Sequence, residues 1–462
     1  MNELWTYSAV ELAAGIAQKD FSCAEVVEAH LRRIEAVNPR VNAVVRILAD
    51  EARRDAVEAD RKVAAGAPLG PLHGVPFTIK DNIDVAGHPT THGLPVYADA
   101  VAPSDAPVVE RMRAAGAIAI GRTNLPDLGV FLSTESTLYG LTKNPWNPER
   151  TVGGSSGGEG AALATGMSPM GLGNDSSGSL RNPANATGVA TIKPTQWRVP
   201  DASFQHQGQM LFYQLFVSQG PMARRIRDVR VALGVLEGAH PRDPWSLDPP
   251  VAPPLGTAPL RVAMVSEPPG GPTAPVIAEV VRNAGGALRD AGYEVVEILP
   301  PRYEETLHLK PQIESDEMRY KMKEFAAKGK YLKSLYAPVT DSSAEVVLNR
   351  YIVRHELARL WSQFMAEYPL VLSPVWAQLP FEVGFDLGTP ESAYAAYVIA
   401  RPVLPANLFG LPSACVSAGR DLATGLPIGV LLTGRRMRDG ECLDAAEAIE
   451  ARLGLKTPID PG

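Results

Sequence analysis

The chain contains 462 residues, of which 45% are hydrophobic and 21% are charged. These proportions are those of an ordinary globular protein long enough to bury a large core, and they exclude a disordered or fibrous chain. The formal net charge of −7 shows no excess of basic residues of the kind that binds nucleic acid, so nucleic-acid binding is not expected.

Cysteine and histidine residues are too few and too scattered to predict a disulfide framework or a metal site. The three cysteines, Cys23, Cys415 and Cys442, are far apart without C-x-x-C spacing, and none of the eight histidines has metal-ligand spacing. No apolar run reaches the roughly 18 residues of a membrane helix, and the first residues lack a basic region followed by an apolar one. We therefore expect a cytoplasmic protein without metal, membrane contact or signal peptide.

The first 64 residues predict two capped helices, a strand and a third helix. Each of the sequences Ser8–Glu11 and Ser22–Glu25 fits a capping box, in which serine accepts from a first-turn amide and glutamate reaches back. The second helix is expected to end near Val37, ahead of a proline. Valine-rich residues 42–48 predict a strand, and residues 51–64 predict a helix with a charged face.

A second apolar run, Val75–Asn82, contains a lysine at its end, Lys80. A lysine that ends a buried strand is desolvated, which disfavours its charged form and makes it a usable base. A helix at 106–115 and a strand at 117–121 follow. This alternation of strands and helices predicts a parallel or mixed sheet with helices on its faces.

Two serine- and glycine-rich loops, 151–160 and 173–183, flank a helix-compatible run at 159–167. Glycine permits positive φ and close approach to the backbone, so each loop can present hydroxyls and bare amides to one point. The first loop also fits G-x-S-x-G, which would make Ser155 the nucleophile of an α/β-hydrolase, but residues 144–150 are a poor strand for that elbow. The loop lacks the Gly-Lys-Ser/Thr ending of a phosphate-binding loop.

The second half of the chain predicts a connector and a helical insertion. Residues 210–217 are apolar and partly aromatic, and the proline-rich stretch at about 240–275 reads as a connector with one strand inside it. A helical insertion at about 302–365 presents either a solvated face or, through Met318 and Met322, a cover for a substrate entrance. The other expected elements are helices at 224–236, 275–292 and 438–452, and strands at 293–299, 370–379, 408–416 and 427–433.

Three motifs in a fixed order carry a resemblance to a known family. They are Lys80 after its apolar strand, the run Gly153–Gly158, and Gly178–Arg181 followed by Lys193–Thr195. The chain resembles the amidase signature enzymes, which are serine hydrolases with a Ser-cisSer-Lys triad, from about Ser8 to about Ala451. The resemblance implies a single domain of the α/β class over residues 1–462. Its large, mixed and mostly parallel β-sheet would have helices on both faces, with the catalytic motifs within about 60–235.

The resemblance also assigns roles to individual residues. Lys80 would be the base, Ser155 the bridging serine in a cis peptide, and Ser179 the nucleophile. A serine hydroxyl is a poor nucleophile until a base takes its proton, and a neutral lysine can do so through an intervening hydroxyl. The expected oxyanion hole consists of the backbone N–H groups of Ser176, Ser177, Gly178 and Ser179. The expected supporting residues are Asp175, Arg181 and Ser156, and the candidates for substrate contact are Gly154, Met210 and Phe216.

Three positions depart from the family pattern. Ser177 and Trp197 stand where the family usually has glycine, and Asn174 stands where it usually has threonine. Ser177 keeps its backbone N–H but adds a Cβ and a hydroxyl beside the expected oxyanion hole. Trp197 predicts an altered loop and an altered wall of the substrate site.

We therefore expect a cofactor-free amidase that acylates Ser179 with a linear amide, or with a similar carbamate or ester, and then deacylates it with water. Aromatic and methionine residues favour an apolar or aryl substrate, of the kind used by aryl acylamidases and urethanases. One alternative is the A component of a tRNA-dependent amidotransferase with partner subunits, which the acidic balance disfavours. Another is a non-catalytic binding homologue, which intact Lys80, Ser155 and Ser179 disfavour. The sequence is also compatible with a homodimer.

Overall fold

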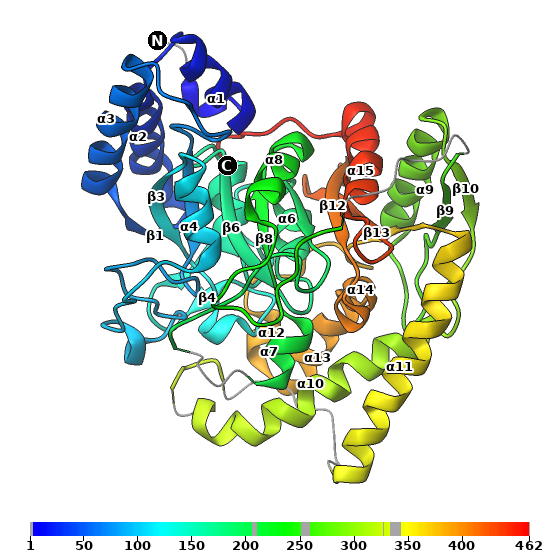
Figure 1. The fold of residues 1–462 in the computed structure, drawn as a ribbon. Coiled ribbons are helices and arrows are strands. Elements are labelled where there is room, and N and C mark those ends of the chain that lie inside the picture. The colour runs from blue at the N-terminus through cyan, green and yellow to red at the C-terminus, as the bar shows by residue number, and fades with distance from the viewer. Residues whose placement is uncertain (1–2, 206–209, 251–258, 327, 333–342, 462) are drawn as a thin grey trace.

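The computed structural model describes residues 3–205, 210–250, 259–326, 328–332 and 343–461, and it describes no side chains for residues 318–326. An 11-stranded sheet forms its centre, in the order β1-β3-β2-β6-β8-β7-β12-β13-β11-β9-β10 (Figure 1). The strands are β1 Val44–Ile47, β2 Pro76–Lys80, β3 Ile118–Thr123, β6 Met170–Asp175, β7 Ala190–Lys193, β8 Ser218–Ala223, β9 Arg261–Met264, β10 Glu294–Glu297, β11 Leu370–Pro374, β12 Ser413–Arg420 and β13 Pro427–Gly434. A separate two-stranded sheet pairs β4 Glu135–Ser136 with β5 Gly140–Leu141.

The sheet is mixed, as expected, but its parallel share is smaller than the sequence predicts. Parallel pairing is confined to β2 with β3 and β6, and to β9 with β10 and β11. The other neighbouring strands are antiparallel. β12 and β13 show the reason, because a turn of only a few residues joins them, whereas parallel neighbours require a long crossover.

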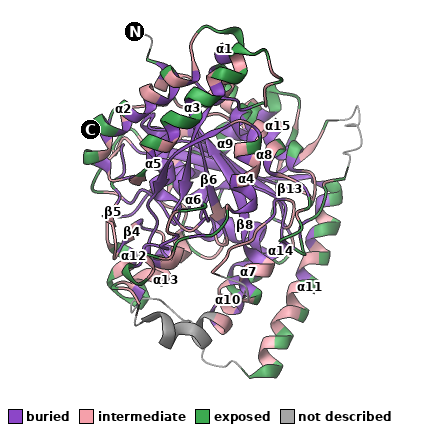
Figure 2. Cartoon of the chain, turned by 60° about the vertical axis from the view of Figure 1, so that its left-hand side comes forward, coloured by how far each residue is buried: buried purple, intermediate pink, exposed green. Residues whose placement is uncertain are grey.

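Helices flank the sheet in separate layers. The helices are α1 Ala9–Gln18, α2 Cys23–Val41, α3 Ala49–Ala64, α4 Pro107–Ala114, α5 Gly157–Ala164, α6 Arg181–Thr187, α7 Leu211–Phe216, α8 Ile226–Leu236, α9 Pro275–Asp290, α10 Tyr303–Ala326, α11 Ala344–Glu367, α12 Phe385–Gly388, α13 Pro390–Ile399, α14 Leu404–Phe409 and α15 Asp439–Leu453. Helices α5 and α6 pack on each other and on central strands, while α15 packs on α8, α9 and strands β12 and β13. Figure 2 shows the sheet buried between these helices.

Local capping signals are confirmed, while two predicted boundaries are wrong. Ser8 and Ser22 each form the capping box that starts α1 and α2. Helix α2 continues past the expected end through Pro39 to Val41, because its last turn is closed by Asn42, which has a φ of 56° and donates its N–H to Asn38. The strand expected at 408–416 begins only at Ser413, since Leu408 belongs to α14.

The helical insertion lies at one end of the molecule, where α10 approaches α7 (Figure 1). The first half of α10 is not a solvated face, because Leu309, Lys310 and Ile313 are buried. The side chains of Met318 and Met322 lie outside the described residues. Within the described part of the chain, no helix is both long and apolar enough to cross a membrane.

Candidate active site

Lys80 ends β2, which lies between β3 and β6 in the sheet, and its side chain is fully buried. Its Nζ lies 2.6 Å from Ser155 Oγ and 2.8 Å from Asn174 Oδ1. Burial lowers the pKa of Lys80 to about 7, and the charges of Asp175 and Glu159 partly oppose that shift. The neutral amine is therefore accessible near neutral pH, and its nearest hydroxyl is that of Ser155.

Ser155 sits in a tight loop that only glycine-rich sequence can build. The peptide bond between Gly154 and Ser155 is cis, as the resemblance implies. A Cβ on Gly154 would lie 2.4 Å from the carbonyl oxygen of Phe131, so the position requires glycine. Ser156 N donates to Ser179 O at 3.2 Å and thereby joins the two serine loops.

The loop that carries Ser179 is held by a buried ion pair, as expected. Asp175 accepts from Arg181 Nε at 2.9 Å, and both side chains are fully buried. Burial alone would raise the pKa of Asp175, but the charge and hydrogen bonds of Arg181 outweigh it and hold this pKa well below its ordinary value. Asp175 also accepts from the backbone N–H of Leu180 and of Gly178, at 3.2 and 2.8 Å. One of the four expected oxyanion donors, Gly178 N–H, is thus engaged within its own loop.

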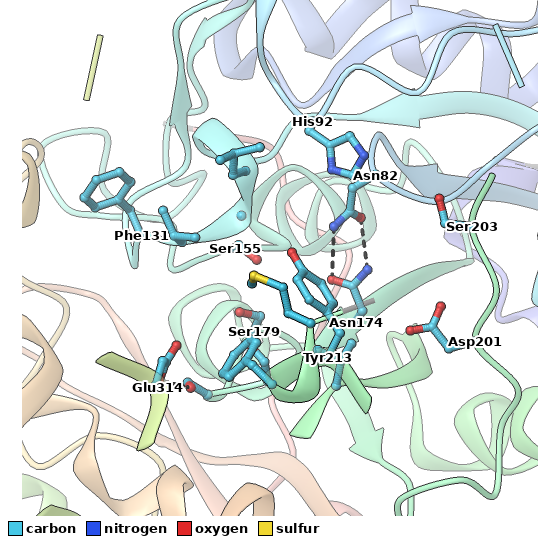
Figure 3. Close-up of a pocket in the computed structure, with 18 of the residues that line it drawn as sticks. Asn82, His92, Phe131, Ser155, Asn174, Ser179, Asp201, Ser203, Tyr213 and Glu314 are labelled. Carbon is cyan, nitrogen blue, oxygen red and sulfur yellow. Dashed lines mark hydrogen bonds between the residues drawn. The ribbon is translucent and has the colours of Figure 1, made fainter. Parts of the chain in front are cut away.

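Asn174 and Asn82 are residues that the sequence analysis did not place in the site. Asn174 Oδ1 accepts from Lys80, and Asn174 Nδ2 donates to Asn82 Oδ1 at 3.0 Å (Figure 3). Both asparagines line the same cavity as Ser155 and Ser179. The sequence did carry a signal for Asn174, because asparagine replaces the family's usual threonine there. The position lies one residue before Asp175, on the strand beside the one that carries Lys80.

Ser155 and Ser179 open into a cavity of about 510 Å³. Aromatic and aliphatic side chains form part of its lining: Tyr97, Leu128, Val130, Phe131, Leu132, Met210, Phe212, Tyr213, Val217 and Tyr397. Two carboxylic residues, Asp201 and Glu314, also line it, and Figure 3 shows them on different sides of the nucleophile loop. A cavity of this size, with aromatic and aliphatic side chains beside a similar share of polar ones, fits a small organic molecule that carries both apolar and polar groups.

Of the three predicted substrate contacts, one lines the cavity and two do not. Met210 lines the cavity, whereas Gly154 and Phe216 do not. Phe216 ends α7 with its side chain fully buried behind Phe212, at a ring distance of 5.8 Å. Trp197 does not line the cavity either, so the prediction that it alters the substrate wall is wrong. It does occupy an altered loop, with a φ of 70°, and it stacks on Trp245 at 6.1 Å.

Comparison with known proteins agrees with this geometry. The family model described as Amidase matches residues 25–443. The chain belongs to the amidase family. The amidase is 40% identical to an indoleacetamide hydrolase of Bradyrhizobium diazoefficiens, over 98% of this chain and 87% of that protein. It is 31% identical to the A component of the glutamyl-tRNA(Gln) amidotransferase of Salinispora tropica, over 99% of each chain.

The fold of the amidase is also that of solved members of the family. A bacterial aryl acylamidase of the amidase signature family superposes with a TM-score of 0.82 at 28% identity, over 96% of each chain. The protein is therefore an enzyme that hydrolyses amide C–N bonds. The family gives the reaction, and the residues of this chain decide how it is carried out.

Proposed function

We propose that Ser179 is the nucleophile and that Lys80 activates it through Ser155. The observation that carries this proposal is the 2.6 Å contact between Lys80 Nζ and Ser155 Oγ at the wall of the cavity that Ser179 lines. Neutral Lys80 takes the proton of Ser155, and Ser155 takes that of Ser179 as its Oγ attacks the amide carbonyl carbon.

The resulting tetrahedral oxyanion accepts hydrogen bonds from backbone N–H groups of the Ser176–Ser179 loop, for which Ser176, Ser177 and Ser179 are the proposed donors. Losing one such donor typically costs about 10²–10³ in rate. The proton then returns from Lys80 through Ser155 to the leaving nitrogen, the C–N bond breaks, and Ser179 is left acylated. A water molecule, activated through the same relay, then attacks the acyl group and releases the carboxylic acid and free Ser179.

The substrate of this proposal is an amide with an apolar or aryl acyl group. The aromatic lining of the cavity supports it, and so does the similarity to an indoleacetamide hydrolase and to an aryl acylamidase. Carbamates and esters are the nearest chemical variants, since both present a carbonyl carbon to Ser179.

A substrate panel tests this function. We expect measurable kcat/KM with arylacetamides and anilides, lower values with short aliphatic amides, and loss of all of them in Ser179→Ala. Turnover of ethyl carbamates at a comparable rate would extend the substrate class to urethanes. Turnover of aliphatic amides alone would contradict the proposed substrate class.

The similarity to an amidotransferase component over the full chain supports a second candidate. In that function the amidase would release ammonia for a partner protein that binds tRNA. Glutamine as the preferred substrate, together with co-purification of such a partner, would favour it over the arylamide proposal.

A further inference from the structure

Helix α10 brings an ion pair into the cavity that the reaction described above does not use. Lys310 and Glu314 lie one turn apart, with 3.0 Å between Nζ and Oε2. The Lys310 side chain is fully buried and the Glu314 side chain is 24% exposed and lines the cavity. The rings of Phe212 and Phe216 each lie 4.9 Å from Lys310 Nζ. The lysine thus stands behind the carboxylate, away from the cavity, and compensates its charge.

One oxygen of Glu314 is fully occupied by protein donors. Oε2 accepts from Lys310 Nζ, from Ser177 Oγ at 3.1 Å and from Tyr397 OH at 3.2 Å. Lys310 Nζ also donates to Ser177 Oγ at 2.9 Å. These bonds fix the carboxylate between α10, α13 and the loop that carries Ser179. Figure 3 shows Glu314 on the same side of the cavity as Ser179.

The other oxygen, Oε1, has no hydrogen bond from the residues that the structure describes. An ionised carboxylate only accepts hydrogen bonds, so a group bound against Oε1 must be a donor. Because Lys310 already balances the charge, a neutral N–H is sufficient and a cation is not required. Phe212 and Tyr397 line the same cavity as Glu314, and Tyr397 OH donates to its Oε2, so aromatic rings are available to pack against a flat, donor-bearing ring.

We propose that Glu314 is a specificity-determining residue that selects acyl groups with an aromatic N–H donor, such as an indole, by accepting that hydrogen bond at Oε1. This inference rests on the proposed function, since it places the acyl group of the substrate in the cavity next to Ser179. It gives the departure from glycine at Ser177 a role, because the Ser177 hydroxyl helps to hold the carboxylate.

The test compares indole-3-acetamide with benzofuran-3-acetamide, in which an oxygen atom replaces the N–H with little change of shape. Wild-type kcat/KM is expected to favour the indole by about ten- to a hundredfold, the range for a hydrogen bond to a charged group. The alkaline hydrolysis rates of the two amides, measured without enzyme, correct for intrinsic reactivity. A corrected wild-type ratio near one would overturn the inference without any variant, while turnover of both amides would leave the proposed function intact.

Two double variants isolate the acceptor. Lys310→Met with Glu314→Gln removes both charges and keeps a carbonyl acceptor, so the preference should persist at about two- to tenfold. Lys310→Met with Glu314→Leu removes both charges and the acceptor, so the ratio should fall to about one. Since the ratio is taken within each variant, a general loss of activity cancels.

Asp201 is the competing acceptor, and Asp201→Asn is therefore the third variant. Burial raises the pKa of Asp201 to about 6, and its carboxyl already accepts from Gln219 at 3.0 Å. Loss of the indole preference in Asp201→Asn, together with its retention in the double variant Lys310→Met with Glu314→Leu, would make Asp201 the acceptor of the indole N–H. That result would overturn the inference. Failure of every variant and of wild type to hydrolyse either amide would overturn the proposed substrate class as well.

Discussion

Glu159 is a fully buried carboxyl group whose charge, where it is ionised, acts on the proposed base. It accepts hydrogen bonds from Thr78 and from Thr123, and burial raises its pKa to about 8. Glu159 is therefore largely protonated and uncharged at the pH at which Lys80, with a pKa of about 7, loses its proton. Asp175, whose pKa lies well below its ordinary value, is the carboxylate that favours the protonated amine of Lys80 at that pH.

Glu159→Gln should leave the acidic limb of the kcat/KM profile nearly in place. Neutral Lys80 is the base, so activity rises with pH through a pKa near 7. Glu159 is largely protonated at that pH and glutamine is its uncharged counterpart, so we expect a shift of less than about half a pH unit. The profile is measured with an arylacetamide between pH 5 and 9, and a shift of about one unit or more to lower pH would show that Glu159 is ionised beside Lys80.

Asn174→Asp should move the same limb to higher pH. The new carboxylate would replace an amide oxygen that lies 2.8 Å from Lys80 Nζ, and an opposite charge at that distance raises a lysine pKa. We expect a shift of about one pH unit or more to higher pH. Glu159→Gln is the matched control, because equal shifts in the two variants would show that the new carboxylate does not act through the charge of Lys80.

At the scale of elements, the Asp175 and Arg181 ion pair joins the end of β6 to the start of α6 across the nucleophile loop. Asp175→Asn leaves the Arg181 guanidinium buried without its counter-charge. Breaking a fully buried pair in this way costs about 3–5 kcal/mol in the free energy of unfolding. Urea denaturation measures the change.

The control for this substitution is an ion pair on the surface. Glu58 lies 3.1 Å from Arg61 on α3, with side chains 57% and 72% exposed. Glu58→Gln should change the free energy of unfolding by at most about 1 kcal/mol. A loss in Asp175→Asn no larger than that in Glu58→Gln would contradict the proposed support of the loop.

The elements that the sequence predicts well are those whose signals are local. The capping boxes at Ser8 and Ser22 are complete within four residues, and the ion pair of Asp175 with Arg181 joins residues six apart. The burial of Lys310 was not predictable in this way, because its sequence is that of a solvated helix. Its environment comes from α7, whose phenylalanines lie almost 100 residues earlier.

At the scale of the whole molecule, the order of strands is the feature that sequence periodicity could not give. The strand that carries Lys80 lies beside β6, which leads to Ser179, although some 90 residues separate them along the chain. Periodicity identifies a strand but does not choose its partner, and for this reason the parallel share of the sheet was overestimated. The family resemblance identified residues that lie close together in the site, such as Lys80 and Ser155, which hydrophobic periodicity could not do.

We propose that residues 1–462 form a single cooperative unit, with the proline-rich stretch at 240–275 as a connector inside it. The sheet supports this, because β9, which lies inside the connector, pairs with β10 and with β11 in the same sheet as β1. Urea unfolding followed by far-UV circular dichroism and by tryptophan fluorescence should give one coincident transition. Two separated transitions would indicate two independent units.

The central claim, that Ser179 is the nucleophile activated through Ser155, is tested most directly by intact-mass spectrometry after treatment with a fluorophosphonate. The account predicts one adduct on wild type, mapped by peptide analysis to Ser179. It predicts no adduct on Ser179→Ala, and slow formation of the Ser179 adduct in Ser155→Ala because the relay is broken. An adduct that persists in Ser179→Ala and disappears in Ser155→Ala would make Ser155 the nucleophile and contradict the account.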